Sequence, residues 1–220
     1  GVTTPCVTGA RQSLEAKDYE VLVCHATGTG GQSLEALAAG GFLAGVLDVT
    51  TTELADELVG GVLSAGPDRL EAAGAEGVPQ VVSLGALDMV NFGPRESVPE
   101  RFRGRNLYVH NPTVTLMRTT PEECRELGGI LAAKLNAATG PVALFVPLRG
   151  VSAISVEGGV FHDPVADRAL FESVKAILDP GVEVHEIDAD INDPRFARAM
   201  AARLDEMIQA RQGSAMAVEV

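Results

Sequence analysis

Short apolar runs alternate with amphipathic or polar stretches along almost the whole chain. Six of these runs have the length of a buried strand, and glycine, proline or polar residues follow most of them. They comprise residues 20–26, 43–49, 80–84, 107–110, 142–147 and 182–187. Near-continuous apolar strands separated by helices are typical of parallel sheets covered on both faces. We therefore predict an α/β fold with a mostly parallel, Rossmann-like sheet of about six strands and helices on both faces.

Helical periodicity occupies most of the intervals between these runs. The clearest helix begins at Thr120, where a threonine in the capping position precedes Pro121 and two acidic residues, and it is expected to end near residue 138. Residues 85–105 are rich in proline, glycine and polar side chains and are expected to form a long functional loop or a small excursion. The other expected helices are 33–39, 52–63, 167–178 (begun near residue 163) and 194–210.

The organisation of the chain indicates one folded unit. We find no flexible linker, and we expect a single α/β domain over residues 1–210 with a frayed tail over residues 211–220. Hydrophobic residues make up 46% of the chain and charged residues 21%, which is too apolar for a disordered protein. A chain of this composition is long enough to bury one substantial core.

The charge of the chain argues against polyanionic macromolecules as partners. The formal net charge is −13 at pH 7, whereas nucleic acids and anionic membranes both require a basic face. The apolar runs are far shorter than the roughly 20 residues needed to cross a bilayer, and no charged-then-apolar leader opens the sequence. Three cysteines, far apart and odd in number, fit a reducing compartment. We therefore expect a cytoplasmic protein without nucleic-acid or membrane partners.

A glycine-rich loop follows the first expected strand and precedes a helix. Its three glycines allow successive backbone N–H groups to turn inward as a nest at the helix N-terminus, and threonine hydroxyls add donors. Such a nest favours a phosphate without needing a lysine, although neither the dinucleotide-binding nor the P-loop pattern is present. The alternative is a tight turn that needs glycine geometry alone. The expected ligand-binding residues of this loop are Thr27, Gly28, Thr29, Gly30 and Gly31.

Polar residues near the ends of the other expected strands complete the candidate ligand site, because ligands of open parallel sheets gather beyond the carboxyl ends of the strands. Asp48, at the end of a buried strand, needs a partner among loop donors, a metal or a ligand hydroxyl; the alternative reading of its loop is a helix cap. Arg118 is placed to clamp a phosphate or carboxylate, or else forms a surface ion pair. The candidate residues are Asp48, Thr50, Asp88, Asn111 and Arg118.

Catalysis is a second hypothesis. His25 and His110 both end expected strands and could meet in space, where either would act as a general base. The amides of residues 28–31 would then stabilise an oxyanion, and the chain would be an enzyme, such as a hydrolase, acting on a small acidic metabolite. A structural role for each histidine is the alternative. The four histidines are too scattered to form a metal site, and no G-x-S-x-G nucleophile elbow is present.

Seven stretches of the sequence carry a resemblance to a known family. They are G-V-T-T-P-C-V from Gly1, H-A-T-G-T-G-G from His25, L-D-V-T-T-T-E-L-A-D-E-L from Leu47, G-A-L-D-M-V-N-F-G from Gly85, H-N-P-T-V-T-L-M-R-T-T from His110, P-L-R-G-V-S from Pro147 and I-N-D from Ile191. Through them the chain resembles the family of the ATP-binding tomato mosaic virus resistance protein and its microbial relatives of unknown function. It is similar to the second half of the family's two-part conserved region.

The resemblance implies binding of ATP with Mg²⁺, a two-subdomain α/β unit and a homodimer. For the plant member it also implies binding of a viral replication protein. It further implies that this chain packs on an N-terminal, Rossmann-like half that is missing from this sequence.

Three hypotheses about function follow. In the first, the chain is an ATP-like nucleotide or other phosphate-ligand binding domain of a two-part intracellular protein. The nest at residues 28–31 and Arg118 would hold phosphates, while Asp48 and Asp88 would hold hydroxyls or a Mg²⁺ ion through water. Gly30→Val is then expected to abolish binding in a protein that still folds. The second hypothesis is the enzyme described above, and the third is a dimerisation or interaction module whose polar loops form an interface.

Overall fold

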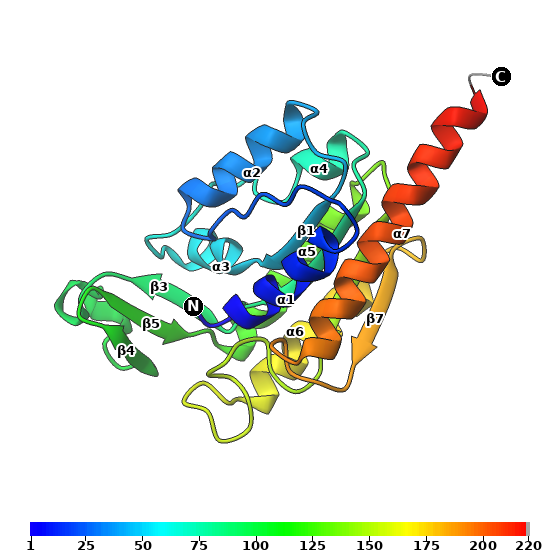
Figure 1. Ribbon diagram of the computed structural model, residues 1–220. Helices are drawn as coiled ribbons and strands as arrows, with labels where there is room; N and C mark the ends of the chain where they lie inside the picture. Colours follow the sequence, from blue (N-terminus) through cyan, green and yellow to red (C-terminus); the bar gives the residue numbers. More distant parts are fainter. Residues whose placement is uncertain (219–220) are drawn as a thin grey trace.

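The computed structural model describes the backbone of residues 1–218 and the side chains of residues 1–213. Within them, the main sheet has four parallel strands (Figure 1). Their order across the sheet is β1 (Val46–Thr50), β2 (Gln80–Gly85), β6 (Val142–Pro147) and β7 (Glu183–Ile187). Every residue of β2 and β6 is buried, because these central strands have neighbours on both edges and helices on both faces. β1 and β7 form the two edges of the sheet.

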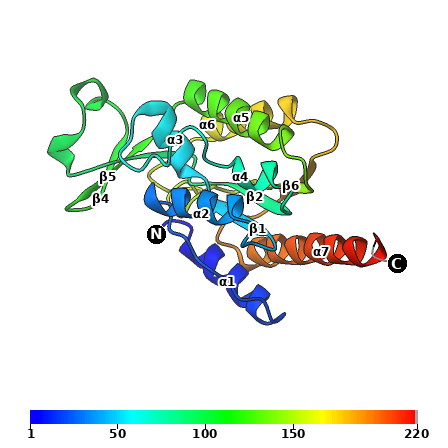
Figure 2. The same cartoon turned by 90° about the horizontal axis from the view of Figure 1, so that it is seen from above.

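Two layers of helices cover the main sheet, and the alternation of side chains along each strand decides which layer a residue meets. On β2, Val82 packs into one layer and its neighbour Val81 into the other. The first layer consists of α3 (Thr52–Val59), α5 (Pro121–Asn136) and α6 (Pro164–Ile177). The second consists of α1 (Thr4–Glu15) and α7 (Pro194–Val218). Figure 2 shows α5 and α6 on one side of the sheet and α1 and α7 on the other.

A short helical pair lies beside the edge strand β1. It consists of α2 (Thr29–Ala39) and the single turn α4 (Ala72–Ala75). Ala38 of α2, Ala73 of α4 and Val46 of β1 share a small apolar cluster. This packing holds the helix that follows the glycine-rich loop next to the edge of the main sheet.

A second, smaller sheet projects from one end of the molecule (Figure 1). Its three antiparallel strands lie in the order β3 (Met89–Phe92), β5 (Val114–Arg118) and β4 (Leu107–Asn111). The expected excursion at residues 85–105 thus contains a strand. It also contains two 3₁₀ turns, η1 (Arg95–Ser97) and η2 (Glu100–Phe102).

The α/β class is confirmed, but the main sheet has four strands rather than about six. The expected strands at 43–49, 80–84, 142–147 and 182–187 correspond to its members. The run 107–110 forms a strand of the small antiparallel sheet instead, where its neighbour β5 follows directly in the chain. The strand expected at 20–26 is not formed in this structure: the segment runs beside β1 with a cavity between them.

The helices were predicted better than the strands. Thr120 begins α5 with a capping box, in which its side chain accepts from the Glu123 amide and the Glu123 carboxylate accepts from the Thr120 amide. Helix α1 was not predicted, because its buried stripe includes the small residues Cys6 and Ala10. α7 continues through Val218, so the backbone of residues 211–218 is helical, and residues 219–220 of the expected tail lie outside the described residues. Over residues 1–218, no helix combines the length and the hydropathy required to span a bilayer.

Candidate functional site

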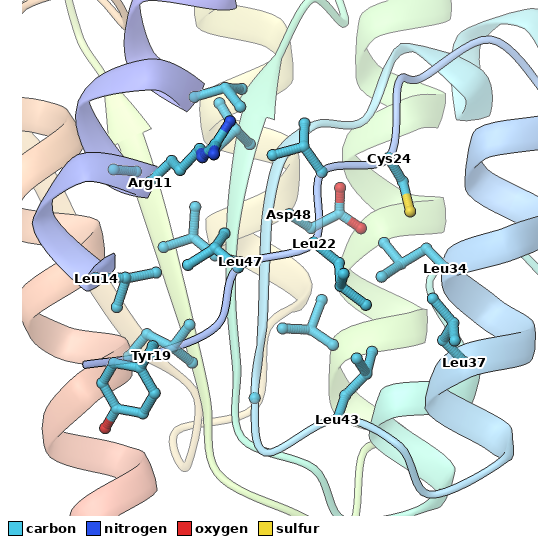
Figure 3. Close-up of a pocket in the computed structure, with 18 of the residues that line it drawn as sticks. Arg11, Leu14, Tyr19, Leu22, Cys24, Leu34, Leu37, Leu43, Leu47 and Asp48 are labelled. Atoms are coloured by element: carbon cyan, nitrogen blue, oxygen red, sulfur yellow. The ribbon is translucent and has the colours of Figure 1, made fainter. Parts of the chain in front are cut away.

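A cavity of about 450 Å³ lies between segment 20–26, the edge strand β1 and the helices α1, α2 and α7 (Figure 3). Its walls are mainly apolar, and several leucines surround it: Leu14, Leu22, Leu34, Leu37, Leu43 and Leu47. One end is polar and is formed by Gly30, Gly31, Asp48, Glu53 and Arg69. The cavity therefore joins an apolar chamber to a buried set of charges.

Arg69 is the centre of the polar end, and only 3% of its surface is exposed. Its two terminal nitrogens donate to the Asp48 carboxylate over 2.6 and 2.8 Å, and its Nε donates to Glu53 Oε2 over 2.7 Å. A third carboxylate, that of Glu35, accepts from the same guanidinium over 3.1 Å. Burial lowers the pKa of Arg69, but Asp48 and Glu53 raise it by more, so the pKa lies above its ordinary value and the guanidinium stays charged.

The glycine-rich loop does hold an anion, and that anion belongs to the chain itself. The amides of Gly28 and Gly31 donate to Glu53 Oε1 over 2.7 and 3.1 Å, and Glu53 is completely buried. A Cβ atom at Gly31 would overlap this carboxylate, which explains why glycine is needed there. The nest geometry expected from the sequence is therefore present, but a phosphate would have to displace Glu53 to use it.

Only part of the sequence-predicted site meets at the cavity. Gly30, Gly31, Asp48 and Thr50 line it, and the hydroxyl of Thr50 lies 2.8 Å from that of Thr3. In the same loop, Gly28 is buried against Glu53, while Thr27 and Thr29 are exposed. The partner that Asp48 requires is Arg69, a cation in the loop after α3 that was not predicted from the sequence.

Arg118 and Asp88 belong to a separate buried cluster. Arg118 donates to Asp167 over 2.5 Å and to the carbonyl oxygen of Phe161 over 2.9 Å, so it forms a buried structural ion pair rather than a surface one. Asp88 Oδ2 accepts from the Ser152 hydroxyl over 2.7 Å, and its Oδ1 has no hydrogen-bond partner among the described residues. Burial raises the pKa of Asp88 to about 6, against the opposing effect of Arg118. Neither residue lines the cavity.

The candidate catalytic residues sit on different elements and both are exposed. His25 lies in the segment before α2, whereas His110 lies in β4, where its ring is near that of Tyr108 and the neighbouring Asn111 is also exposed. Two amides of the proposed oxyanion hole, those of Gly28 and Gly31, already donate to Glu53. Within the described residues, no group of three His, Cys, Asp or Glu side chains could hold a metal ion.

Three residues of this buried charge cluster were not predicted from the sequence: Glu35, Glu53 as the occupant of the nest, and Arg69. Arg69 lies in the polar break between α3 and α4, where no periodicity marks it. One signal was present in the sequence. A carboxylate in a buried strand requires a countercharge, and the chain has 17 Lys and Arg for 30 Asp and Glu, so a nearby arginine in a loop was a candidate.

Comparison with known proteins identifies the family. Residues 1–208 match the model of the C-terminal domain of the uncharacterised protein family UPF0261. The chain belongs to this family. A UPF0261 protein of Clostridium tetani is 56% identical over 95% of the chain and 52% of its own length. A UPF0261 protein of Rhizobium meliloti is 53% identical over 92% of the chain and 51% of its own length.

The family includes a plant relative whose name describes a biological role. The ToMV resistance protein Tm-1(GCR237) of Solanum lycopersicum is 44% identical over 91% of this chain and 27% of its own length. The resemblance read from the sequence motifs is thereby confirmed. The chain spans about half the length of the bacterial relatives it matches, so this UPF0261 domain corresponds to the C-terminal half of a two-part protein.

Proposed function

We propose that this UPF0261 domain binds an ATP-like nucleotide through its nucleoside part, in the cavity between segment 20–26 and β1. The observation that carries the proposal is the cavity itself. Its volume of about 450 Å³ falls within the range of small-molecule sites. Such sites are mainly apolar with a few polar groups that fix orientation, and the leucine-lined chamber beside Asp48 and Arg69 has this composition.

Asp48 is the residue best placed to recognise a ribose. In dinucleotide-binding α/β folds, an acidic residue roughly 20 positions after the glycine-rich turn accepts a hydrogen bond from a ribose hydroxyl. Asp48 follows the glycine-rich loop at a similar interval and is the buried middle residue of β1. Each of its oxygens accepts one hydrogen bond from Arg69, which leaves lone pairs for ligand hydroxyls.

The phosphates contribute little to this mode of binding. Glu53 already fills the nest with three charge-assisted hydrogen bonds, from Gly28, Gly31 and Arg69, and Arg118 is committed to Asp167. Displacing a buried, fully bonded carboxylate is costly. Adenosine is therefore expected to bind nearly as tightly as ATP, whereas inorganic phosphate is expected not to bind.

Thermal unfolding with adenosine, ATP, Mg²⁺ with ATP, and inorganic phosphate tests the proposal. A ligand at 100 times its Kd adds roughly 2.7 kcal/mol of stability, which for a domain of this size raises the Tm by about 5–10 °C. Leu22→Glu, at the exposed edge of the cavity, should abolish the rise. Val62→Glu, which has a similar exposure outside the cavity, should retain it. A cooperative transition that none of the nucleosides or nucleotides shifts would refute the proposal.

The partners expected from the resemblance belong to the same proposal. About half of each matched bacterial relative lies outside the aligned region, which supports a functional unit made of this domain and another half packed against it. The homodimer stays a prediction, and sedimentation equilibrium of the chain at several concentrations would measure it.

A further inference from the structure

We propose that segment 20–26 pairs with the free edge of β1 as a fifth parallel strand, and that the cavity exists only while this pairing is broken. The pairing itself does not depend on which ligand binds. The pairing also controls the access of a nucleotide to the cavity, and this consequence rests on the proposed function.

The segment has the sequence of a strand but lacks the surroundings of one. Its residues E-V-L-V-C-H-A are rich in β-branched and apolar side chains, which favour extended, half-buried structure. Nevertheless Leu22 is 59% exposed and Val23 is 40% exposed. Leu22 and Cys24, two positions apart, both point toward the α2 side of the cavity (Figure 3), as alternate residues of a strand do.

β1 offers the edge that such a strand requires. It is the terminal strand of the main sheet, paired with β2 on one side only. An edge strand carries unpaired N–H and C=O groups that pair readily with another extended segment. The cavity occupies the space between this edge and segment 20–26.

Both ends of the segment are already fixed at the matching ends of β1. Before it, the Tyr19 hydroxyl donates to Asp205 of α7 over 2.8 Å, and the neighbouring α7 residues Leu204 and Ile208 lie against Gly45, which precedes β1. After it, the Gly28 amide donates to Glu53, which follows β1. The segment therefore runs parallel to β1, from its start to its end.

The chain order is that of a βαβ unit. Segment 20–26 leads through the glycine-rich loop and α2 into β1. Two parallel strands need a crossover of a dozen or more residues, usually containing a helix, and residues 27–45 provide it. To complete the unit, segment 20–26 moves toward β1 into the space of the cavity.

Hydrogen exchange measured by mass spectrometry on the chain without ligand tests the pairing. The amides of residues 21–25 are expected to exchange roughly tenfold or more slowly than an unstructured chain. Alternate residues of an edge strand point their N–H groups toward its neighbour. One of the two variants Leu22→Pro and Val23→Pro therefore removes a ladder donor in any register, and at least one should lose the protection.

The pairing would be overturned if the amides of residues 21–25 exchanged at the rate of an unstructured chain. The amides of β2 and β6 in the same wild-type sample must be protected, which shows that the protein is folded. This measurement decides the question even if both proline variants fail to fold. Saturating adenosine should speed the exchange of residues 21–25 by holding the cavity open. If the amides of residues 21–25 are protected without ligand and adenosine leaves this protection unchanged, the strand pairing is upheld and the proposed nucleoside site is refuted. Failure of the pairing and failure of the nucleoside site are therefore distinguishable.

Discussion

The guanidinium of Arg69 holds the carboxylate of Asp48 through two parallel hydrogen bonds of 2.6 and 2.8 Å, at a place where both side chains are almost completely buried. Bidentate pairs of this kind fix geometry as well as charge. Arg69 connects Asp48 of β1 to Glu53 and so to the glycine-rich loop. The pair therefore positions the polar end of the cavity and Glu53, which binds the Gly28 amide after segment 20–26.

Removing Arg69 should destabilise the fold. Arg69→Met keeps most of the volume but leaves Asp48 and Glu53 buried without their countercharge, and breaking a buried pair in this way costs about 3–5 kcal/mol. Urea unfolding followed by circular dichroism measures the loss. Arg149→Met is the control, because Arg149 pairs with Asp188 on the exposed surface and no measurable change is expected. Equal stability of the two variants would contradict the structural role of Arg69.

Removing Glu53 should create an anion site that the wild type lacks. Glu53→Ala frees the amides of Gly28 and Gly31, which bind Oε1 of this carboxylate, and the Nε of Arg69, which binds its Oε2. The variant is expected to be less stable than the wild type but to gain Tm on addition of inorganic phosphate, since the nest then has no occupant. Glu57→Ala, an exposed residue of the same helix, is the control and should not respond. A phosphate response in the wild type would show that Glu53 does not block the nest.

The buried Asp88 should make stability depend on pH. Burial raises its pKa from 3.8 to about 6 in the folded protein, so between about pH 4 and pH 6 the folded state binds more proton than the unfolded state. Stability from this group is thus present at low pH and lost as the pH rises through 6. The stability of the wild type relative to Asp88→Asn is expected to fall between pH 4.5 and pH 7, as measured by urea unfolding.

Asp193 provides the matched control for this pH dependence. Hydrogen bonds from Arg195 lower its pKa to about 2, so it is ionised in the folded protein throughout the measured range. The stability difference between the wild type and Asp193→Asn should stay nearly constant from pH 4.5 to 7. A constant difference for Asp88→Asn as well would mean that Asp88 does not titrate in this range.

Substitution of Gly30 should disturb the fold, contrary to what the sequence led us to expect. A Cβ atom at this position would overlap the backbone carbonyl of His25, so a side chain forces the loop to move. Gly30→Ala is expected to cost about 1–3 kcal/mol, as in other overpacked sites. Gly104→Ala, where a Cβ meets open space, should be nearly neutral. Denaturant unfolding of both variants measures the contrast, and a neutral Gly30→Ala would place the loop backbone elsewhere.

The sequence by itself determined the features that depend on local chemistry. Apolar runs of strand length located β2 and β6, because a central strand covered on both faces must be apolar throughout. Thr120 and Glu123 specified the start of α5 through a capping box that involves only neighbouring residues. The glycines at 28–31 likewise specified an anion-binding nest, since its geometry is a property of the loop backbone.

Only the tertiary structure decided which partners these features meet. Arg69 and Glu53 lie 21 and 22 positions, respectively, from the groups they bind at Asp48 and Gly31, and no local pattern encodes such pairings. Segment 20–26 likewise has the composition of a strand, but it can form one only by pairing with β1, and the local sequence does not encode that pairing. Side-chain type is a local property of the sequence, whereas hydrogen-bond partners, burial and cavities depend on contacts between distant residues. The sequence therefore indicated an anion site, and the fold supplied Glu53 as its occupant.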